Sequence, residues 1–333
     1  MAYIEKINSI LTPQKNYSYT VVDLFAGCGG LSLGFEANGF STVGFEINED
    51  ACATYNLNLA GICFNENLNI HADFPEADVL IGGPPCQPFS VIGNQKGLED
   101  ARNGFPICMK AVEQIKPKIF LFENVRGLLY KNKWYLNQFV EGLSSNYDVK
   151  FKLLNAKHFD VPQNRERVFI IGCRKGVFTF PKEKEYQVSA GEALGTLAIQ
   201  VEDDSKFLTK NMNRYIAKYE KASQCTTNRD LHLDKPARTL TCRNLAGATG
   251  DMHRIKLPDG RRRRLTHLEA AVLQSFPEWF KFLGNETSIF NQIGNAVPPM
   301  MAYNIARSIK GHLNKMYGRN STVSFSSDLK QAS

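Results

Sequence analysis

The chain has 333 residues, enough for one large domain and a smaller one. Its contents of 43% hydrophobic and 22% charged residues are ordinary for a soluble globular protein, and no apolar run approaches the length needed to cross a bilayer. The formal net charge of +7 is too small to indicate a nucleic-acid partner by itself.

The eight cysteines are scattered along the chain. They form no C-x-x-C pair, and none combines with a histidine at zinc-finger spacing. We therefore expect neither disulfides nor a metal site, and we interpret most of these cysteines as small core residues.

The first 175 residues alternate between strand-like and helix-like segments. Short apolar runs predict strands, and segments with helical spacing predict helices. This alternation predicts an α/β fold, a doubly wound and mostly parallel sheet covered on both faces. The expected strands are 20–25, 41–46, 79–81, 119–123, 149–154 and 168–173, and the expected helices are 31–38, 49–58, 103–115 and 134–144.

The pattern changes near residue 175, where the chain becomes polar and irregular, with one helical stretch expected at 206–221. Regular structure returns at Thr266, an expected helix N-cap with Glu269 at the third helical position. An amphipathic helix is expected at 300–316. We expect a first domain at 1–175 completed by 281–316, a smaller loop-rich domain at 176–280, and a disordered polar tail at 317–333.

A glycine loop follows the first expected strand. Its glycines allow a ligand to approach the backbone closely, but Ser32 stands where a dinucleotide fingerprint has its third glycine, so a ligand without a pyrophosphate fits better. Glu46 ends the next strand and could accept ribose hydroxyls, while Phe25 could stack on an adenine. Either an adenosine-containing cofactor such as S-adenosylmethionine or an ordinary βαβ unit with a solvated Glu46 would explain this spacing.

Four further features could carry chemistry or bind a ligand. Cys86 lies in a Gly- and Pro-bounded loop after a strand, where a thiolate would be a rigidly held nucleophile. Glu123 ends another strand and would neighbour Cys86 if the two strands are adjacent; a helix-capping pair is the alternative. Alternation places Arg165 and Arg167 on one face, unless they belong to a solvated edge strand. The arginine run 261–264 is either a solvated loop or a phosphate-binding strip.

These segments resemble those of cytosine-C5 DNA methyltransferases of the bacterial modification type. The matching pieces occur in the family's order and span nearly the whole chain except its variable middle. They are DLFAGCGGLSLGF at 23–35, FEIN at 45–48, GGPPCQPFS at 82–90, ENV at 123–125, QNRERVFIIG at 163–172, RTLT at 238–241, RRLTHLEAAVLQSFPEWF at 263–280 and NQIGNAVPP at 291–299.

The resemblance implies a catalytic set. Cys86 would add to C6 of a cytosine that has been flipped out of the duplex. Glu123 would contact N3 and the exocyclic amine, Arg165 would hold the ring O2, and Arg167 would support the site. The segment 91–102 resembles the family loop that closes over bound DNA.

The resemblance also implies S-adenosylmethionine as cofactor, S-adenosylhomocysteine as product, and no metal. In place of the family's acidic–apolar pair after the third strand, this chain has Asn67 and Leu68, with Asp73 as an alternative in another register. The implied cofactor-binding residues are Phe25, Ala26, Gly27, Gly29, Gly30, Leu31, Glu46, Ile47, Asn67, Leu68, Pro84, Asn295 and Ala296.

By the same resemblance the smaller domain would recognise the target sequence in double-stranded DNA. The DNA-binding candidates are Gln87, Ser90, Arg102, Arg238, Thr239, Arg243, Arg261, Arg262 and Arg263. The family implies a cytoplasmic, nucleoid-associated monomer of bacterial or phage origin, with no membrane contact and no stable protein partner. A cognate restriction endonuclease or an orphan role both remain open.

Three rival interpretations change the function. A relative that methylates tRNA would carry a Cys-Phe-Thr triplet, which this chain lacks. A non-catalytic binding subunit is disfavoured by the intact set of Cys86, Glu123 and Arg165. A nicotinamide enzyme is disfavoured by Ser32 in the glycine loop.

Overall fold

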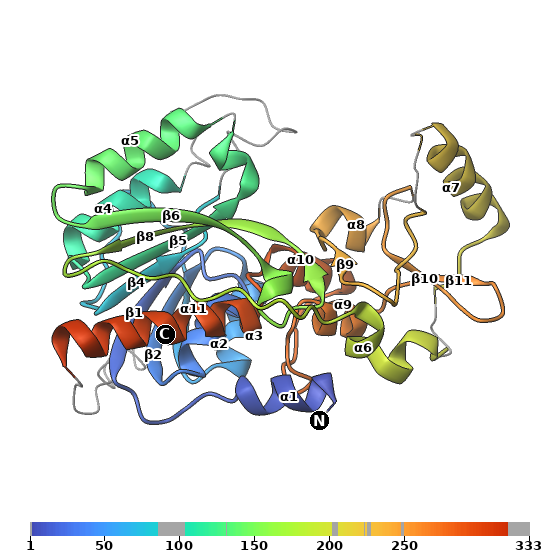
Figure 1. Cartoon of the computed structure of the whole chain (residues 1–333), viewed down its shortest axis with the longest axis horizontal. Coiled ribbons are helices and arrows are strands. Elements are labelled where there is room, and N and C mark those ends of the chain that lie inside the picture. Colours follow the sequence, from blue (N-terminus) through green and yellow to red (C-terminus); the bar gives the residue numbers. More distant parts are fainter. Residues whose placement is uncertain are drawn as a thin grey trace.

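A computed structural model describes residues 2–85, 104–130, 132–201, 206–222, 224, 228–247 and 250–318 (Figure 1). Cys86, Gln87, Ser90, Arg102 and the expected closing loop lie outside these residues, as does the tail beyond Gly318. In the part of the chain that the structure describes, no helix has the length and apolar character to cross a membrane.

A seven-stranded sheet lies at the centre of the larger part of the molecule, in the order β3-β2-β1-β4-β5-β8-β6. Neighbouring strands from β3 to β5 are parallel, whereas β8 is antiparallel to β5 and β6. The strands are β1 Tyr19–Leu24, β2 Phe40–Glu46, β3 Ile62–Asn65, β4 Val79–Gly82, β5 Ile119–Val125, β6 Asp148–Asn155 and β8 Glu166–Cys173. The strand order reverses between β1 and β4, the switch point at which open α/β sheets bind ligands.

Helices cover both faces of this sheet (Figure 1). The alternation of side chains along β1 shows why, because Tyr19 and Val21 join one hydrophobic cluster while Val22 and Leu24 join the other. The first cluster lies under α1 Tyr3–Ile10, α2 Gly30–Glu36, α3 Glu49–Asn58 and α11 Pro299–Tyr317. The second lies under α4 Phe105–Ile115 and α5 Lys133–Leu143.

Helix α11 lies directly against α2. A Cβ atom at Gly34 would fall 2.4 Å from the backbone nitrogen of Tyr303 and 2.5 Å from Cβ of Ala302, so a larger residue could not sit there without moving a helix. The segment after the smaller lobe therefore returns to complete the layer that covers the start of the sheet.

The chain between β8 and α11 forms a smaller lobe, which extends to the right in Figure 1. A small cluster of Leu208, Ile216 and Met252 is its own, but Leu194, Leu245 and many others belong to the same hydrophobic cluster as α2 and α11. The division into domains at residues 176 and 280 thus stays a prediction. The elements are α6 Ala190–Leu194, α7 Lys210–Ala222, β9 Ala237–Arg238, α8 Cys242–Ala246, β10 Arg254–Lys256, β11 Arg262–Arg264, α9 His267–Leu273 and α10 Glu286–Asn295.

Three short 3-10 helices and one short strand complete the described elements. The helices are η3 Arg126–Leu129, η4 Ala156–His158 and η5 Gly195–Ile199. Strand β7 Gln163–Asn164 pairs in parallel with β9 and so joins the segment before β8 to the smaller lobe.

The predicted elements of the first 175 residues are present with small shifts at their ends, and α3 has the predicted bounds. Asn48 caps α3 by accepting a hydrogen bond from the Ala51 N–H at 2.9 Å. The predicted capping box of Thr266 and Glu269 is confirmed at the start of α9. Helix α1 and strand β3 were not predicted.

Candidate active site

The segment that leads to Cys86 lies against the end of β5. Strands β4 and β5 are parallel neighbours, with Gly82 opposite Phe122. A Cβ atom at Gly83 would lie 3.5 Å from Oε2 of Glu123, and the Asn124 side chain donates a hydrogen bond to the Pro84 carbonyl at 3.1 Å. The adjacency of the two strands, on which the expected pairing of Cys86 with Glu123 depends, is therefore confirmed, and the contacts extend as far as Pro84.

Glu123 pairs with Arg167 across the antiparallel neighbours β5 and β8. The Arg167 Nε lies 2.8 Å from Oε1 of Glu123, and both side chains are largely buried. Burial raises the pKa of Glu123, while the charges of Arg167 and Arg165 act in the opposite direction. This carboxyl group can thus hold a proton at a higher pH than an ordinary glutamate.

Arg165 faces a different set of partners, because its guanidinium is committed to main-chain carbonyls. It donates to Leu240 at 2.7 Å, to Gly294 at 2.9 Å and to Ala296 at 3.0 Å, and its Nε has no partner among the described residues. Burial lowers the pKa of Arg165 well below its ordinary value. These bonds commit both terminal nitrogens of Arg165 to main-chain carbonyls, which does not favour the expected contact of Arg165 with the ring O2.

The glycine loop after β1 has the shape expected of a ligand-binding turn. Phe25, Gly27 and Gly29 have φ values of 59°, 56° and 88°, and a Cβ atom at Gly27 would meet no atom within 4 Å. The Gly27 N–H donates to Oε2 of Glu46 at 2.9 Å, and the Asn48 N–H donates to Oε1 at 2.8 Å. The loop and the end of β2 are therefore fixed to each other with open space above Gly27.

The residues beyond β2 and β3 extend this edge. Ile47 is 62% exposed, and the Asn65 side chain donates to its carbonyl at 3.0 Å. The Glu66 N–H donates to the Glu46 carbonyl at 3.0 Å, which brings the following Asn67 and Leu68 close to Glu46. Asn67 is exposed and Leu68 is buried.

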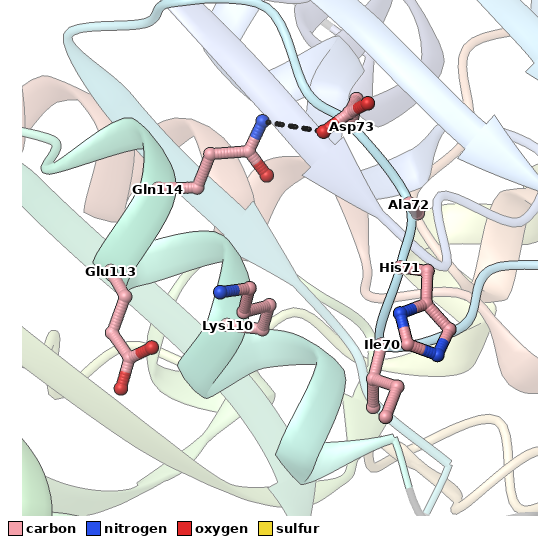
Figure 2. Close-up of a pocket in the computed structure, with 7 residues that line it drawn as sticks. All are labelled: Ile70, His71, Ala72, Asp73, Lys110, Glu113 and Gln114. Carbon is pink, nitrogen blue, oxygen red and sulfur yellow. Dashed lines mark hydrogen bonds between the residues drawn. The ribbon is translucent and has the colours of Figure 1, made fainter.

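Asp73 lies in a separate place. It lines a cavity of about 370 Å³ between the segment 70–73 and α4, and its carboxylate accepts a hydrogen bond from Gln114 at 3.4 Å (Figure 2). Figure 2 shows Lys110 and Glu113 of α4 on the opposite wall. None of the other expected cofactor-binding residues lines this cavity, so its position favours Asn67 and Leu68 over Asp73 as neighbours of Glu46.

The motif at 291–299 also packs against the glycine loop that follows β1. A Cβ atom at Gly30 would fall 2.5 Å from the Val297 carbonyl oxygen, so Gly30 and this motif are in contact. Asn295 is exposed, and its Oδ1 accepts a hydrogen bond from the Cys242 thiol at 2.9 Å. The Ala296 carbonyl accepts from Arg165 and also from Gln274, at 2.8 Å. Leu31 is buried in the core.

The arginine run does not form a single phosphate-binding strip, and this corrects the sequence prediction. Arg263 is 2% exposed and forms a bidentate ion pair with Glu269, at 2.7 and 2.9 Å, so its guanidinium is not open to a phosphate in this structure. Arg262 pairs with Asp230 at 2.9 Å and is mostly buried. Arg261 is exposed and pairs with Asp259 at 2.6 Å.

The other DNA-binding candidates in the smaller lobe differ in whether their side chains already form hydrogen bonds. Arg238 donates to the side chain and the carbonyl of Asp251, both at 3.0 Å, and Thr239 donates to the Asn164 carbonyl at 2.7 Å. Arg243 is exposed, and its guanidinium has no hydrogen bond or ion pair within the described ranges.

One buried acid near the loop was not predicted as a site residue. Asp23 is 1% exposed; its Oδ2 accepts a hydrogen bond from Ser32 at 2.7 Å, while Oδ1 has no partner in the described chain. Burial raises the pKa of Asp23 to about 7. The sequence did contain a signal for it, because Asp23 is an acidic residue inside the apolar run of β1. The described residues contain no cluster of His, Cys, Asp or Glu suited to a metal ion.

A glycine loop at the switch point, with an acidic residue ending the next strand, is typical of open α/β folds that bind nucleotides. Residues 19–311 match the model of the C-5 cytosine-specific DNA methylase family. The chain is 53% identical to the type II methyltransferase M.AplI of Arthrospira platensis, over 87% of this chain and 85% of that protein. It is 32% identical to M.NgoFVII of Neisseria gonorrhoeae, over 87% and 86%.

Solved structures agree in fold. A mutant of Spodoptera frugiperda DNMT2 superposes with a TM-score of 0.68 at 19% identity, over 88% of this chain and 100% of that chain. The Entamoeba histolytica methyltransferase EhMeth does so with a TM-score of 0.68 at 17% identity, over 90% and 99%. The chain belongs to the C-5 cytosine-specific DNA methylase family and is a DNA cytosine-5-methyltransferase. The family implies S-adenosylmethionine as the methyl donor.

Proposed function

We propose that the protein methylates a cytosine flipped out of duplex DNA, through a transient bond between the Cys86 sulfur and ring C6. The observation that carries the proposal is the buried pair of Glu123 and Arg167 beside the segment leading to Cys86. Cytosine C5 is a weak nucleophile, but addition of a thiolate at C6 turns the ring into an enamine whose C5 can attack a methyl group.

Glu123 would donate a proton to the ring in this step and take it back later. When the thiolate forms the S–C6 bond, the displaced ring electrons reach N3, which takes up a proton. The raised pKa of Glu123 suits it to donate that proton. After C5 has gained the methyl group, N3 returns its proton to Glu123. Loss of the C5 proton to a base and cleavage of the S–C6 bond then restore the aromatic ring and the thiolate.

Arg167 would take the ring-contacting role that the sequence suggested for Arg165. It holds Glu123 in place through Nε, and its positive charge would stabilise the electron density that builds up on the ring. Arg165 would act as a positioning residue, because it ties the Leu240 segment to the carbonyls of Gly294 and Ala296. Arg167 lies in β8, where it is the register partner of Val125 in β5, and Arg165 directly precedes that strand.

The loop residues would hold S-adenosylmethionine, which supplies an electrophilic methyl group when bound. The open space above Gly27 and the exposed Ile47 fit an adenosine group that approaches the backbone. Glu46 would accept the ribose hydroxyls, and Phe25 and Leu68 would border the adenine. The remaining proposed contacts are Ala26, Gly29, Gly30, Leu31, Asn67, Pro84, Asn295 and Ala296.

The names of the relatives suggest a biological setting. M.AplI and M.NgoFVII are both named type II methyltransferases, so we propose that this enzyme protects host DNA within a restriction-modification system. It would act as a cytoplasmic monomer on duplex DNA, without a stable protein partner. The target recognition would come from the smaller lobe.

Trapping on modified DNA tests the mechanism. Duplex DNA in which 5-fluorocytosine replaces cytosine should give a covalent protein–DNA adduct with S-adenosylmethionine, because the C5 fluorine cannot leave as a proton. Cys86→Ala should form no adduct but should still bind S-adenosylhomocysteine. An adduct that persists in Cys86→Ala would refute the assigned nucleophile.

Bisulfite sequencing of DNA from a host that expresses the protein tests the substrate. New 5-methylcytosine should appear in one sequence context with the wild type and not with Cys86→Ala. Methylation of tRNA but not of duplex DNA would instead support the alternative RNA substrate, and methylation of neither would support a non-catalytic binding role.

A further inference from the structure

Asn295 is the last residue of α10, and the start of α8 lies directly against it. A Cβ atom at Gly294 would fall 2.5 Å from the backbone nitrogen of Cys242 and 2.7 Å from the carbonyl carbon of Thr241, so the two helix ends touch without room for a side chain. Figure 1 shows α8 and α10 beside each other, between the central sheet and the outer end of the smaller lobe. This close approach brings the first residue of α8 next to the last residue of α10.

The two helix ends are also joined by hydrogen bonds. Arg165 connects them, because it donates to the Leu240 carbonyl at 2.7 Å and to the Gly294 carbonyl at 2.9 Å. A capping box of Thr241 and Asn244 then sets the first turn of α8. The start of α8 is therefore held in a fixed place relative to the end of α10.

The Cys242 side chain forms a hydrogen bond with Asn295. Its Sγ lies 2.9 Å from Asn295 Oδ1 and 3.6 Å from the Asn291 carbonyl oxygen, and the shorter distance favours Asn295 as the acceptor for the single thiol hydrogen. Burial raises the pKa of Cys242, although a backbone hydrogen bond and the charge of Arg165 act in the opposite direction. The thiol therefore keeps its hydrogen and acts as a donor at neutral pH.

This bond determines which end of the Asn295 amide faces outward. A side-chain amide has an acceptor oxygen and two N–H donors, and the Cys242 thiol occupies the oxygen. Asn295 is exposed, and no group within the described ranges accepts a hydrogen bond from its Nδ2. A Cβ atom at Gly30 would fall 3.3 Å from Cβ of Ala296, so the amide also lies next to the glycine loop. The two N–H donors are thus available to a ligand beside that loop.

We propose that Cys242 is a positioning residue for cofactor binding, whose thiol holds the Asn295 amide so that Nδ2 donates to an acceptor atom of S-adenosylmethionine. The inference rests on the proposed contact of Asn295 with the cofactor. Without the thiol, the amide can turn over and present its oxygen to the same ligand atom. Two acceptors cannot form a hydrogen bond, so part of the affinity is lost.

The affinity for S-adenosylhomocysteine, measured by calorimetric titration of the full-length protein without DNA, tests the inference. Cys242→Ala removes the donor and should raise the dissociation constant by about 2- to 10-fold, the effect of one net hydrogen bond. Cys242→Ser keeps a donor and should stay within about 2-fold of the wild type. Cys173→Ala is the matched control and should change nothing, because Cys173 pairs with Ile119 at the edge of the sheet away from the glycine loop.

A double-mutant cycle separates positioning from a general effect on packing. If Cys242 acts through the Asn295 amide, Cys242→Ala should cause no further loss of affinity in an Asn295→Ala background. A packing effect would persist there. Thermal melts without ligand verify that each variant is folded. In methylation assays, the KM for S-adenosylmethionine should rise more in Cys242→Ala than kcat falls, since the lost contact serves binding.

Three results would overturn the inference. They are wild-type affinity in Cys242→Ala, an equal loss in Cys242→Ser, and an undiminished effect of Cys242→Ala in the Asn295→Ala background. In each case the wild type still binds S-adenosylhomocysteine, and the proposed methylation of duplex DNA stands. If the wild type binds no S-adenosylhomocysteine, the proposed cofactor site fails together with the inference. A wild type that binds it but methylates no duplex would remove the proposed function and leave the role of Cys242 intact.

Discussion

The arginine run 261–264 allows the stability contribution of a buried arginine to be compared with that of an exposed arginine in the same strand region. Arg263 and Glu269 are each 2% exposed at the side chain, and two hydrogen bonds join them. Replacing Arg263 by Met would leave the Glu269 carboxylate buried without its partner. Removing one member of such a pair costs about 3–5 kcal/mol, so Arg263→Met should lower the free energy of unfolding by that amount.

Arg261→Met is the matched control, because Arg261 and Asp259 are 57% and 47% exposed. A pair in that position contributes about 0–1 kcal/mol. Both variants are unfolded in urea and followed by circular dichroism. The double variant Arg263→Met/Glu269→Met removes both buried charges and should recover part of the loss, less about 1 kcal/mol for the cap that Glu269 gives to α9.

The same variants decide whether Arg263 has a role in DNA binding. We expect Arg263→Met, where it remains folded, to keep the wild-type salt dependence of DNA affinity. A stability within about 1 kcal/mol of the wild type, together with a salt slope shallower by about one, would refute the structural role and restore Arg263 as a phosphate contact.

Three other changes test the catalytic edge and the core. Glu123→Gln should slow methyl transfer by about 10²- to 10⁴-fold in single-turnover assays, because the amide cannot supply the proton, while binding of S-adenosylhomocysteine is retained. Gly34→Ala should lower stability by about 1–3 kcal/mol in a thermal melt, since the new methyl group meets Ala302 at about 2.5 Å, whereas Gly311→Ala on the open side of α11 should not. The raised pKa of Asp23, about 7 in the fold against 3.8 unfolded, means that its contribution to stability is complete below about pH 4 and is lost as the pH rises through 7. Urea titrations between pH 4 and 8 should show a weaker loss for Asp23→Asn than for the wild type.

Each of these has a clear contrary result. Near-normal turnover of Glu123→Gln would remove the proposed proton donor. Equal melting temperatures for Gly34→Ala and the wild type would mean that α2 and α11 can separate without cost. A pH dependence unchanged in Asp23→Asn would assign the titration to another buried acid, such as Glu36, whose pKa burial also raises.

The fold was predictable where local signals and tertiary packing agree. The runs at Thr20 and Ile119 are apolar, buried on both faces and end in polar or glycine residues, so they identify central strands. Strand β3, at Ile62–Asn65, was missed because it is a short edge strand with few buried residues, and its pairing with β2 sets its conformation. The antiparallel direction of β8 likewise depends on its pairing with β5 and β6.

The site was less predictable because hydrogen-bond partners are distant in sequence. The motif that contains Arg165 and Arg167 marks both as functional, but the carbonyls of Gly294 and Ala296 decide which one faces Glu123. The arginine run did contain a usable signal. As part of strand β11, Arg263 must point opposite to Arg262 and Arg264, so alternation could have shown that one arginine faces the core.

The close approach of Gly34 to α11 also has a consequence for biosynthesis. The glycine-loop helix α2 is translated early, but α11, which covers its apolar side, follows all the other described elements in the chain. Until α11 has been made, that apolar face of α2 lacks its cover, and exposed apolar surface of this kind favours aggregation. A newly made chain would therefore complete the covering of α2 only after α11 has been translated.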